Sequence, residues 1–132
     1  MSKGRILMTL ENCEVVAFLA TTRAEDAHGF YCGVLGLELE EDGPFALVLR
    51  TANATLRIQK VREFTPLPFT AMGWKVGDVR AMAEALGRKG VKFERFEGMG
   101  QDDLGIWVSP SGAKVCWFKD PDGNLLSLTQ FG

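Results

Sequence analysis

The side chains that most often carry catalytic chemistry are sparse in this sequence. There is one histidine, His28, and there are three cysteines, Cys13, Cys32 and Cys116, which lie far apart and form no Cys-x-x-Cys pair. Neither a zinc site of standard spacing nor a disulfide framework is therefore available. No Ser-His-Asp or Cys-His set is assembled by spacing. We interpret the cysteines as reduced thiols of a cytoplasmic protein and expect no catalytic role for His28.

A more specific signal lies at Ser127 and Thr129, in the last apolar run of the chain. Successive side chains of a strand point to opposite faces of the sheet. Leu126 and Leu128 would therefore share one face, and Leu125, Ser127 and Thr129 the other. A polar face on an otherwise apolar strand either lines a cavity or turns to water. The pattern alone leaves both interpretations open.

The first half of the chain reads as a strand, a helix and three more strands. A β-branched and aromatic run over 14–22 predicts a buried strand. Apolar residues at helical spacing predict a helix over 24–34, with a cap at Thr21 or Thr22 and an end at Gly36 in the left-handed conformation. Three shorter strands are expected after it: 37–41, 45–50 and 55–59.

The same order repeats in the second half. It follows an extended linker over 61–69, in which two prolines exclude a helix and a central strand. A strand over 70–76 precedes a helix over 79–89, which Asp78 would cap. Four further apolar runs are expected to be strands: 91–96, 106–108, 113–118 and 125–130.

The strongest turn signal is Asp-Pro-Asp-Gly-Asn at 120–124, between the last two strands. Pro121 fixes φ at the second position of the turn, and Gly123 permits a positive φ. The Asp and Asn side chains can accept hydrogen bonds from nearby backbone N–H groups. Two apolar runs around such a turn predict a hairpin.

The repeated order bounds the architecture. At 132 residues the chain is one domain. We divide it into two βαβββ modules, about 12–60 and 70–131, joined by the linker 61–69. Neither module alone can bury its sheet, so the two curved, four-stranded mixed sheets would pair to enclose a central cup. The predicted fold class is α+β.

The composition argues against two classes of partner. The apolar content of 46%, the charged content of 24% and the net charge of −2 are ordinary for a soluble domain. Lys and Arg are scattered rather than clustered, which argues against a nucleic-acid surface. The apolar run at 6–10 is too short for a signal peptide or a membrane span. We expect neither nucleic acid nor a membrane as a partner.

Two motifs in this doubled order resemble the vicinal oxygen chelate superfamily. They are Phe-Tyr and Val-Leu-Gly-Leu within 30–37, and Phe-Lys-Asp-Pro-Asp-Gly-Asn at 118–124. The resemblance covers about residues 14–130. The superfamily contains glyoxalases, bleomycin-binding proteins, thiol-transferring fosfomycin-resistance enzymes and ring-cleaving dioxygenases. The resemblance therefore implies the fold and leaves the chemistry open.

The resemblance also allows a test for a metal site. Many members bind a divalent ion between the modules, with His or Gln on the first strand of a module and Glu on its last strand. The resemblance assigns these ligand positions to four residues that cannot replace imidazole or carboxylate: Val16, Arg57, Ala71 and Ser127. Their neighbours on the same strand faces are not usual ligands either: Phe18, Gly73, Gln59 and Thr129. We predict no bound metal and no other cofactor.

Two of the residues that would face the cup have chemistry of their own. Arg57 would need a partner there, because an unpaired buried cation is costly, and it could hold a carboxylate or phosphate. The alternative is an edge residue whose guanidinium reaches water. Trp117 could stack on a planar ligand, although a plain core aromatic is the simpler alternative.

We therefore predict a metal-independent small-molecule binding protein of the glyoxalase and bleomycin-resistance type. An aromatic or amphipathic ligand would lie in the cup. Because the bleomycin-binding relatives work as dimers, we expect a homodimer, and the pairing of modules within a chain or across a dimer stays open. The ligand-binding residues would be Arg57, Trp117, Ser127, Val16, Phe18, Ala71, Gln59 and Thr129.

Two alternatives remain. A lyase, isomerase or dioxygenase-like enzyme of the same superfamily would have to act through side chains alone, with Arg57 stabilising an oxyanion and a carboxylate as base. No well-placed carboxylate is visible in the sequence, so we favour a binding protein. A purely structural role would call for a filled cup with no opening.

Overall fold

The computed structural model describes residues 8–132. The first sheet is built from β1 Val15–Thr21, β2 Glu38–Asp42, β3 Ala46–Thr51 and β4 Ala54–Lys60. Its strand order is β1-β4-β3-β2, with β1 parallel to β4 and the other neighbours antiparallel. Between β1 and β2 the chain forms α1, Ala24–His28, and continues as a π-helical segment, η1, Gly29–Val34.

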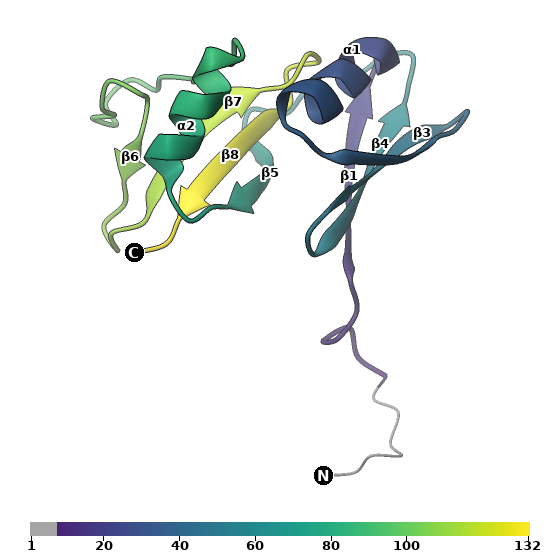
Figure 1. The fold of residues 1–132 in the computed structure, drawn as a ribbon, viewed down its shortest axis with the longest axis horizontal. Coiled ribbons are helices and arrows are strands. Elements are labelled where there is room, and N and C mark those ends of the chain that lie inside the picture. Colours follow the sequence, from purple (N-terminus) through teal and green to yellow (C-terminus); the bar gives the residue numbers. More distant parts are fainter. Residues whose placement is uncertain (1–7) are drawn as a thin grey trace.

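The second sheet repeats this plan. It contains β5 Thr70–Lys75, β6 Trp107–Val108, β7 Lys114–Lys119 and β8 Leu125–Gln130, in the order β5-β8-β7-β6, with β5 parallel to β8. A single helix, α2 Val79–Arg88, follows β5. Figure 1 shows the two sheets side by side, each with its own helical segment. The predicted α+β class, with two four-stranded mixed sheets, is confirmed.

The helical segments cover only one face of each sheet (Figure 1). Strand β1 is therefore not buried on both faces, contrary to the prediction from the sequence. The run at 14–22 was predicted to be buried throughout, but burial alternates along it. Leu19 and Thr21 are buried, whereas Val16 and Phe18 are 45% and 57% exposed. The apolar alternate positions of β1 therefore face away from the core, and this exposure matters for the site described below.

The predicted strand over 91–96 is wrong. Apart from an isolated bridge between Phe93 and Phe118 and a hydrogen bond from Glu94 N to Trp117 O, this segment joins no strand. The reason lies in the following loop. The Gln101 side chain accepts a hydrogen bond from Phe96 N at 2.7 Å and donates one to Glu94 O at 3.0 Å. These backbone groups are therefore satisfied without a neighbouring strand.

Of the three helix ends predicted from the sequence, two are confirmed and one is wrong. The first helix starts after Arg23, which makes no side-chain capping bond, so the expected threonine cap is wrong. Thr21 and Thr22 instead donate their hydroxyls to Asp122, although the Thr21 hydroxyl also accepts from Arg23 N. The predicted left-handed end at Gly36 is confirmed, with φ of +79°. The predicted cap at Asp78 is also confirmed, because its Oδ1 accepts from Ala81 N at 3.0 Å.

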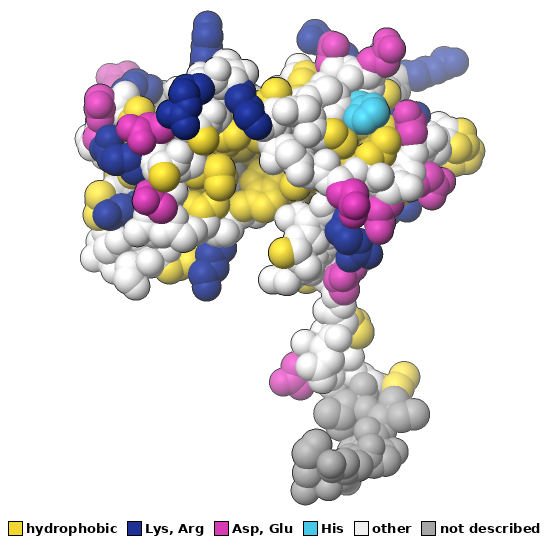
Figure 2. Space-filling model, in the orientation of Figure 1, with side chains coloured by type: hydrophobic (Ala, Val, Ile, Leu, Met, Phe, Trp, Pro, Cys, Tyr) yellow, Lys and Arg dark blue, Asp and Glu magenta, His cyan; other side chains and the backbone are white. Residues whose placement is uncertain are grey.

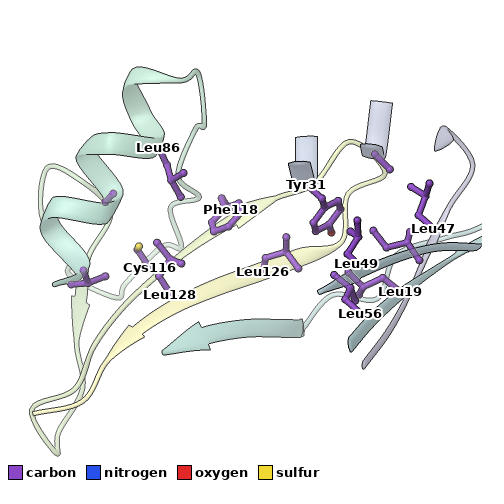
Figure 3. Close-up of a cluster of buried hydrophobic side chains, with 14 of the residues drawn as sticks. Leu19, Tyr31, Leu47, Leu49, Leu56, Leu86, Cys116, Phe118, Leu126 and Leu128 are labelled. Atoms are coloured by element: carbon purple, nitrogen blue, oxygen red, sulfur yellow. The ribbon is translucent and has the colours of Figure 1, made fainter. Parts of the chain in front are cut away.

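One continuous core runs through both sheets. Leu19, Leu47, Leu49 and Leu56 form its part in the first sheet, and Leu126, Leu128 and Cys116 form its part in the second. Figure 3 shows Tyr31 between these two groups and Phe118 among the residues of the second sheet. The Phe30 ring links them, with its centroid 5.3 Å from that of Tyr31 and 6.2 Å from that of Phe118.

The turn at 120–124 joins the two halves, and we call it the junction turn. Tyr31 donates its hydroxyl to Asp120 Oδ2 at 2.7 Å, and both residues are buried. Asn124 N donates to Asp120 Oδ1, and Asn124 Nδ2 donates to Asp120 Oδ2. Burial and the neighbouring Asp120 charge raise the pKa of Tyr31, so the phenol stays protonated. The two motifs that identify the fold in the sequence are thus hydrogen-bond partners.

Candidate functional site

The face of the first sheet turned away from α1 is the first part of the candidate site. We call it the first open face and define it by alternate residues of β1, β3 and β4: Val16, Phe18, Val48, Thr55, Arg57 and Gln59. The intervening residues Leu19, Leu47, Leu49, Leu56 and Ile58 belong to the core. The sequence-predicted residues Val16, Phe18, Arg57 and Gln59 therefore do share one surface.

Arg57 occupies the centre of this face. In the strand register it lies between Phe18 of β1 and Val48 of β3. Neighbouring strands are about 4.8 Å apart, so Arg57 has an apolar residue beside it on each neighbouring strand. Within residues 8–132, no carboxylate forms an ion pair with Arg57. Its side chain is half-buried, which leaves a cation without a protein counter-charge on a mainly apolar surface.

The corresponding surface of the second sheet is the second part of the site. We call it the second open face and define it by alternate residues of β5, β7 and β8: Ala71, Gly73, Val115, Trp117, Ser127 and Thr129. Ser127 lies between Gly73 and Trp117 in the register. The expected parity of β8 is confirmed, because Leu126 and Leu128 belong to the core.

Trp117 is held in place by its neighbours. Its ring meets that of Phe96 edge-on, with centroids 5.4 Å apart, and the Trp107 ring lies at 6.2 Å. Its indole Nε1 donates to Thr70 Oγ1 at 3.1 Å. The ring is only half-buried. A fixed, partly exposed indole is suited to stacking on a planar molecule.

Part of the predicted set meets in one pocket of about 270 Å³. Phe18, Gln59 and Ala71 line it together with Asn124 and apolar residues of the linker. Val16, Arg57, Trp117, Ser127 and Thr129 lie on the two open faces but are not part of its lining. A single chain therefore brings together three of the eight predicted residues in this pocket.

The linker contributes residues that the sequence reasoning missed. Phe64, Leu67 and Phe69 line the same pocket. The prolines predicted a segment with no helix and no central strand, and residues 61–69 form neither, but the apolar residues of this segment were left without a role. Large apolar side chains alternating with prolines in an extended linker were the available signal, because a chain that only spans a gap needs no such side chains.

A second apolar pocket, of about 240 Å³, lies on the helix side of the molecule. Its lining includes Leu35, Leu37, Trp74, Met82 and Leu86. Figure 2 shows hydrophobic side chains gathered between α1 and α2. This pocket contains none of the eight predicted residues, so it is a separate place where an apolar molecule could bind.

The residues at the superfamily's metal positions do not fit a divalent ion. Val16 and Ala71 carry no donor atom, and Arg57 would repel a cation. Ser127 offers only a hydroxyl, whereas such sites use imidazole or carboxylate. Among the described residues there is no group of three His, Cys, Asp or Glu side chains that could hold a metal.

The thiols are poorly suited to nucleophilic chemistry. Cys116 is fully buried, and burial raises its pKa to about 12, with the Asp102 charge adding to the shift. Burial also raises the pKa of Cys32. Both groups are therefore protonated thiols near neutral pH. Cys116 belongs to the core, on the opposite strand face from Trp117.

Comparison with known proteins agrees with the fold. The family model of the Glyoxalase/Bleomycin resistance protein/Dioxygenase superfamily matches residues 13–128. The chain therefore belongs to this superfamily, as the resemblance to the vicinal oxygen chelate group predicted. No curated protein matches the sequence. No helix in the described part of the chain is long and apolar enough to cross a membrane.

Several solved structures resemble the chain over nearly its whole length. The antibiotic-binding protein TnmS3 from Streptomyces sp. CB03234 is 22% identical, with a TM-score of 0.71, covering 94% of this chain and 100% of its own. Lactoylglutathione lyase from Agrobacterium tumefaciens is 15% identical, with a TM-score of 0.71 and coverages of 92% and 96%. A superfamily member from Sphaerobacter thermophilus DSM 20745 is 20% identical, with a TM-score of 0.70 and coverages of 92% and 99%. At such identities the likeness describes the fold alone.

Proposed function

We propose that this chain is a metal-independent binding protein for an aromatic or amphipathic small molecule. The observation that carries the proposal is the pair of open faces. They expose Phe18 and part of Trp117, whose ring packs against Phe96. Among the described residues they offer no set of metal ligands. Small-molecule sites are mainly apolar, with a few polar groups that fix orientation. Arg57, Gln59, Ser127 and Thr129 would be those polar groups.

The proposal includes a homodimer in which the cup closes between two copies. Within one chain, the two halves meet through Tyr31, Phe30 and the junction turn, while Trp117 shares no pocket lining with Phe18. Phe18 and Phe69 are 57% and 58% exposed. Contiguous apolar surface of this kind marks an interaction site. A second copy would cover it by laying its second open face against the first open face.

Two further features support this proposal. One structural neighbour is named as an antibiotic-binding protein, which is an example of small-molecule binding on this fold. The cysteines Cys13, Cys32 and Cys116 are all unpaired, which supports a cytoplasmic location. For the enzymatic alternative, a lactoylglutathione lyase is also among the structural neighbours, but burial keeps the Cys116 thiol protonated and no metal-ligand set is present among the described residues.

The proposal predicts binding of a neutral aromatic probe without metal. Calorimetric titration of the purified protein with 2-naphthylmethanol should show saturable binding, and the probe should raise the melting temperature. Trp117→Leu should weaken binding about tenfold or more, because stacking and apolar contact are lost. Treatment with EDTA should change neither the affinity nor the melting temperature.

Trp74→Leu is the matched control, because Trp74 lines the helix-side pocket. It should leave the affinity unchanged. Binding that is lost in Trp74→Leu but kept in Trp117→Leu would show that the ligand binds in the helix-side pocket. That result would contradict the proposal. Affinity that disappears with EDTA would show that a metal is required.

A further inference from the structure

Glu14 and Glu41 lie on the same side of the first sheet as Arg57, and within residues 8–132 only the Glu14 carboxylate has hydrogen-bond partners. Glu14 accepts from Arg50 Nη1 at 3.2 Å and from Thr55 Oγ1 at 3.0 Å. Glu41 pairs with Val48 in the register, but its Oε2 lies beside Gly43, only 2.8 Å from where a Cβ would stand. Neither carboxylate forms an ion pair with Arg57.

The six residues that define the second open face are uncharged, and two lysines lie at its ends. By strand parity its ends are Lys75 on β5 and Lys119 on β7, which share a side with Gly73 and Trp117. Lys75 Nζ lies 5.8 Å from the centre of the Phe131 ring, and Lys119 lies 3.7 Å from Glu94. With Lys119 paired to Glu94 and Arg50 paired to Glu14 and Glu40, Arg57 and Lys75 are the cations of these two faces that form no ion pair within residues 8–132.

We infer that the ligand of this cup is an aromatic oxyanion whose carboxylate or similar group binds Arg57. This inference rests on the proposed function and names its ligand class. Closing the cup removes water from Arg57, and a buried cation without a partner is costly. A guanidinium binds a planar oxyanion through two parallel hydrogen bonds. The ligand's ring would lie between Phe18 of one copy and Trp117 of the other.

The test compares three naphthalene probes that differ only in charge. Titrations of the wild-type protein would use 2-naphthoate, 2-naphthylmethanol and 2-naphthylmethylammonium. The carboxylate should bind about tenfold or more tighter than the alcohol, because hydrogen bonds between charged groups are stronger than neutral ones. The ammonium compound should bind more weakly than the alcohol.

Arg57→Gln should abolish the preference for the carboxylate while the alcohol still binds. Arg50→Gln is the matched control. Arg50 lies on the same side of the first sheet and its loss changes the charge equally, but its guanidinium is already paired with Glu14 and Glu40. The control should keep the preference. Thermal unfolding of each variant separates a loss of binding from a loss of folding.

The possible outcomes separately test the charge of the ligand, the role of Arg57 and the proposed function. Equal binding of carboxylate and alcohol, or tightest binding of the ammonium compound, would overturn the oxyanion inference and leave the proposed function standing. A carboxylate preference that persists in Arg57→Gln would overturn the role of Arg57. If none of the probes binds, the proposed function itself fails.

Discussion

Gly73 shows how a missing side chain shapes the candidate site. A Cβ at this position would stand 2.1 Å from Ser127 Oγ and 2.8 Å from the Ser127 carbonyl oxygen. Strand β5 can lie against β8 at this point only because Gly73 has no side chain. The position of Ser127 next to Trp117 therefore depends on Gly73.

We expect Gly73→Ala to destabilise the protein by about 1–3 kcal/mol, because overpacking forces the strands apart. Urea denaturation monitored by circular dichroism measures this change. Gly87→Ala is the control, since Gly87 lies in α2 and a Cβ added there would meet no neighbouring atom within 4 Å. That substitution should stabilise by about 0.5–1 kcal/mol. Equal stability of Gly73→Ala and the wild type would show that Gly73 is not needed for this packing.

At the residue scale, the sequence indicates which residues share a face but not what they touch. The alternation along β8 correctly separated Leu126 from Ser127. Parity along a strand is a local property. The close approach of Gly73 to Ser127 depends instead on the pairing of β5 with β8, which are far apart in the chain. No local pattern could have predicted it.

Among the elements, the junction turn is hydrogen-bonded to residues of the first half of the chain. Asp122 accepts from the Thr21 hydroxyl, from Thr22 N at 2.8 Å and from the Thr22 hydroxyl at 2.7 Å. Asn124 Nδ2 donates to Ala20 O at 3.1 Å. The junction turn, in the second half of the chain, thus supplies hydrogen-bond partners to the backbone at the end of β1 and just before α1.

The pKa of Asp122 makes this junction sensitive to acid. Partial burial pushes the pKa up, but hydrogen bonds from Thr21 and Thr22 outweigh it and hold the pKa below its ordinary value. A carboxylate with a lowered folded-state pKa stabilises the fold fully above its ordinary pKa, near 4. That stabilisation is lost as the pH falls through the folded-state pKa.

Asp122→Asn should therefore lower stability by about 1–2 kcal/mol at pH 7, because hydrogen bonds to a charged acceptor are lost. The loss relative to the wild type should shrink as the pH falls below about 4. Urea denaturation at a series of pH values measures both effects. Asp103→Asn is the control, because Asp103 is strongly exposed and lies 3.7 Å from Arg80. A loss in Asp122→Asn that does not change with pH would argue against the charged acceptor.

The elements themselves were predicted well where local chemistry decides them. The turn at 120–124, the left-handed Gly36 and the Asp78 cap all follow from the residues at those positions. The failures come from side-chain contacts that the residues at those positions do not reveal. The hydroxyls of Thr21 and Thr22 are used by Asp122, about a hundred positions away. The segment at 91–96 loses its strand because Gln101 bonds its backbone.

For the whole molecule, the sequence predicts two sheets but not how the open faces are used. The repeat predicts equal halves, and both sheets have the same strand order. The candidate residues divide between the two open faces, and only Phe18, Gln59 and Ala71 meet in one pocket of a single chain. Pairing across a dimer depends on surface complementarity, which no spacing in one sequence encodes.

A metal-free cup that closes between two copies is the central claim for the whole molecule. If the sites are equivalent by symmetry, each dimer contains two cups. The mass of one assembly tests both parts of this claim, because it reports the number of chains and whether a metal is bound.

Native mass spectrometry of the EDTA-treated protein with 2-naphthoate tests this claim most directly. We predict an assembly with the mass of two chains that takes up two probe molecules and contains no metal. A single chain that binds the probe by itself, or a dimer that binds it only after a divalent metal is added back, would contradict the claim.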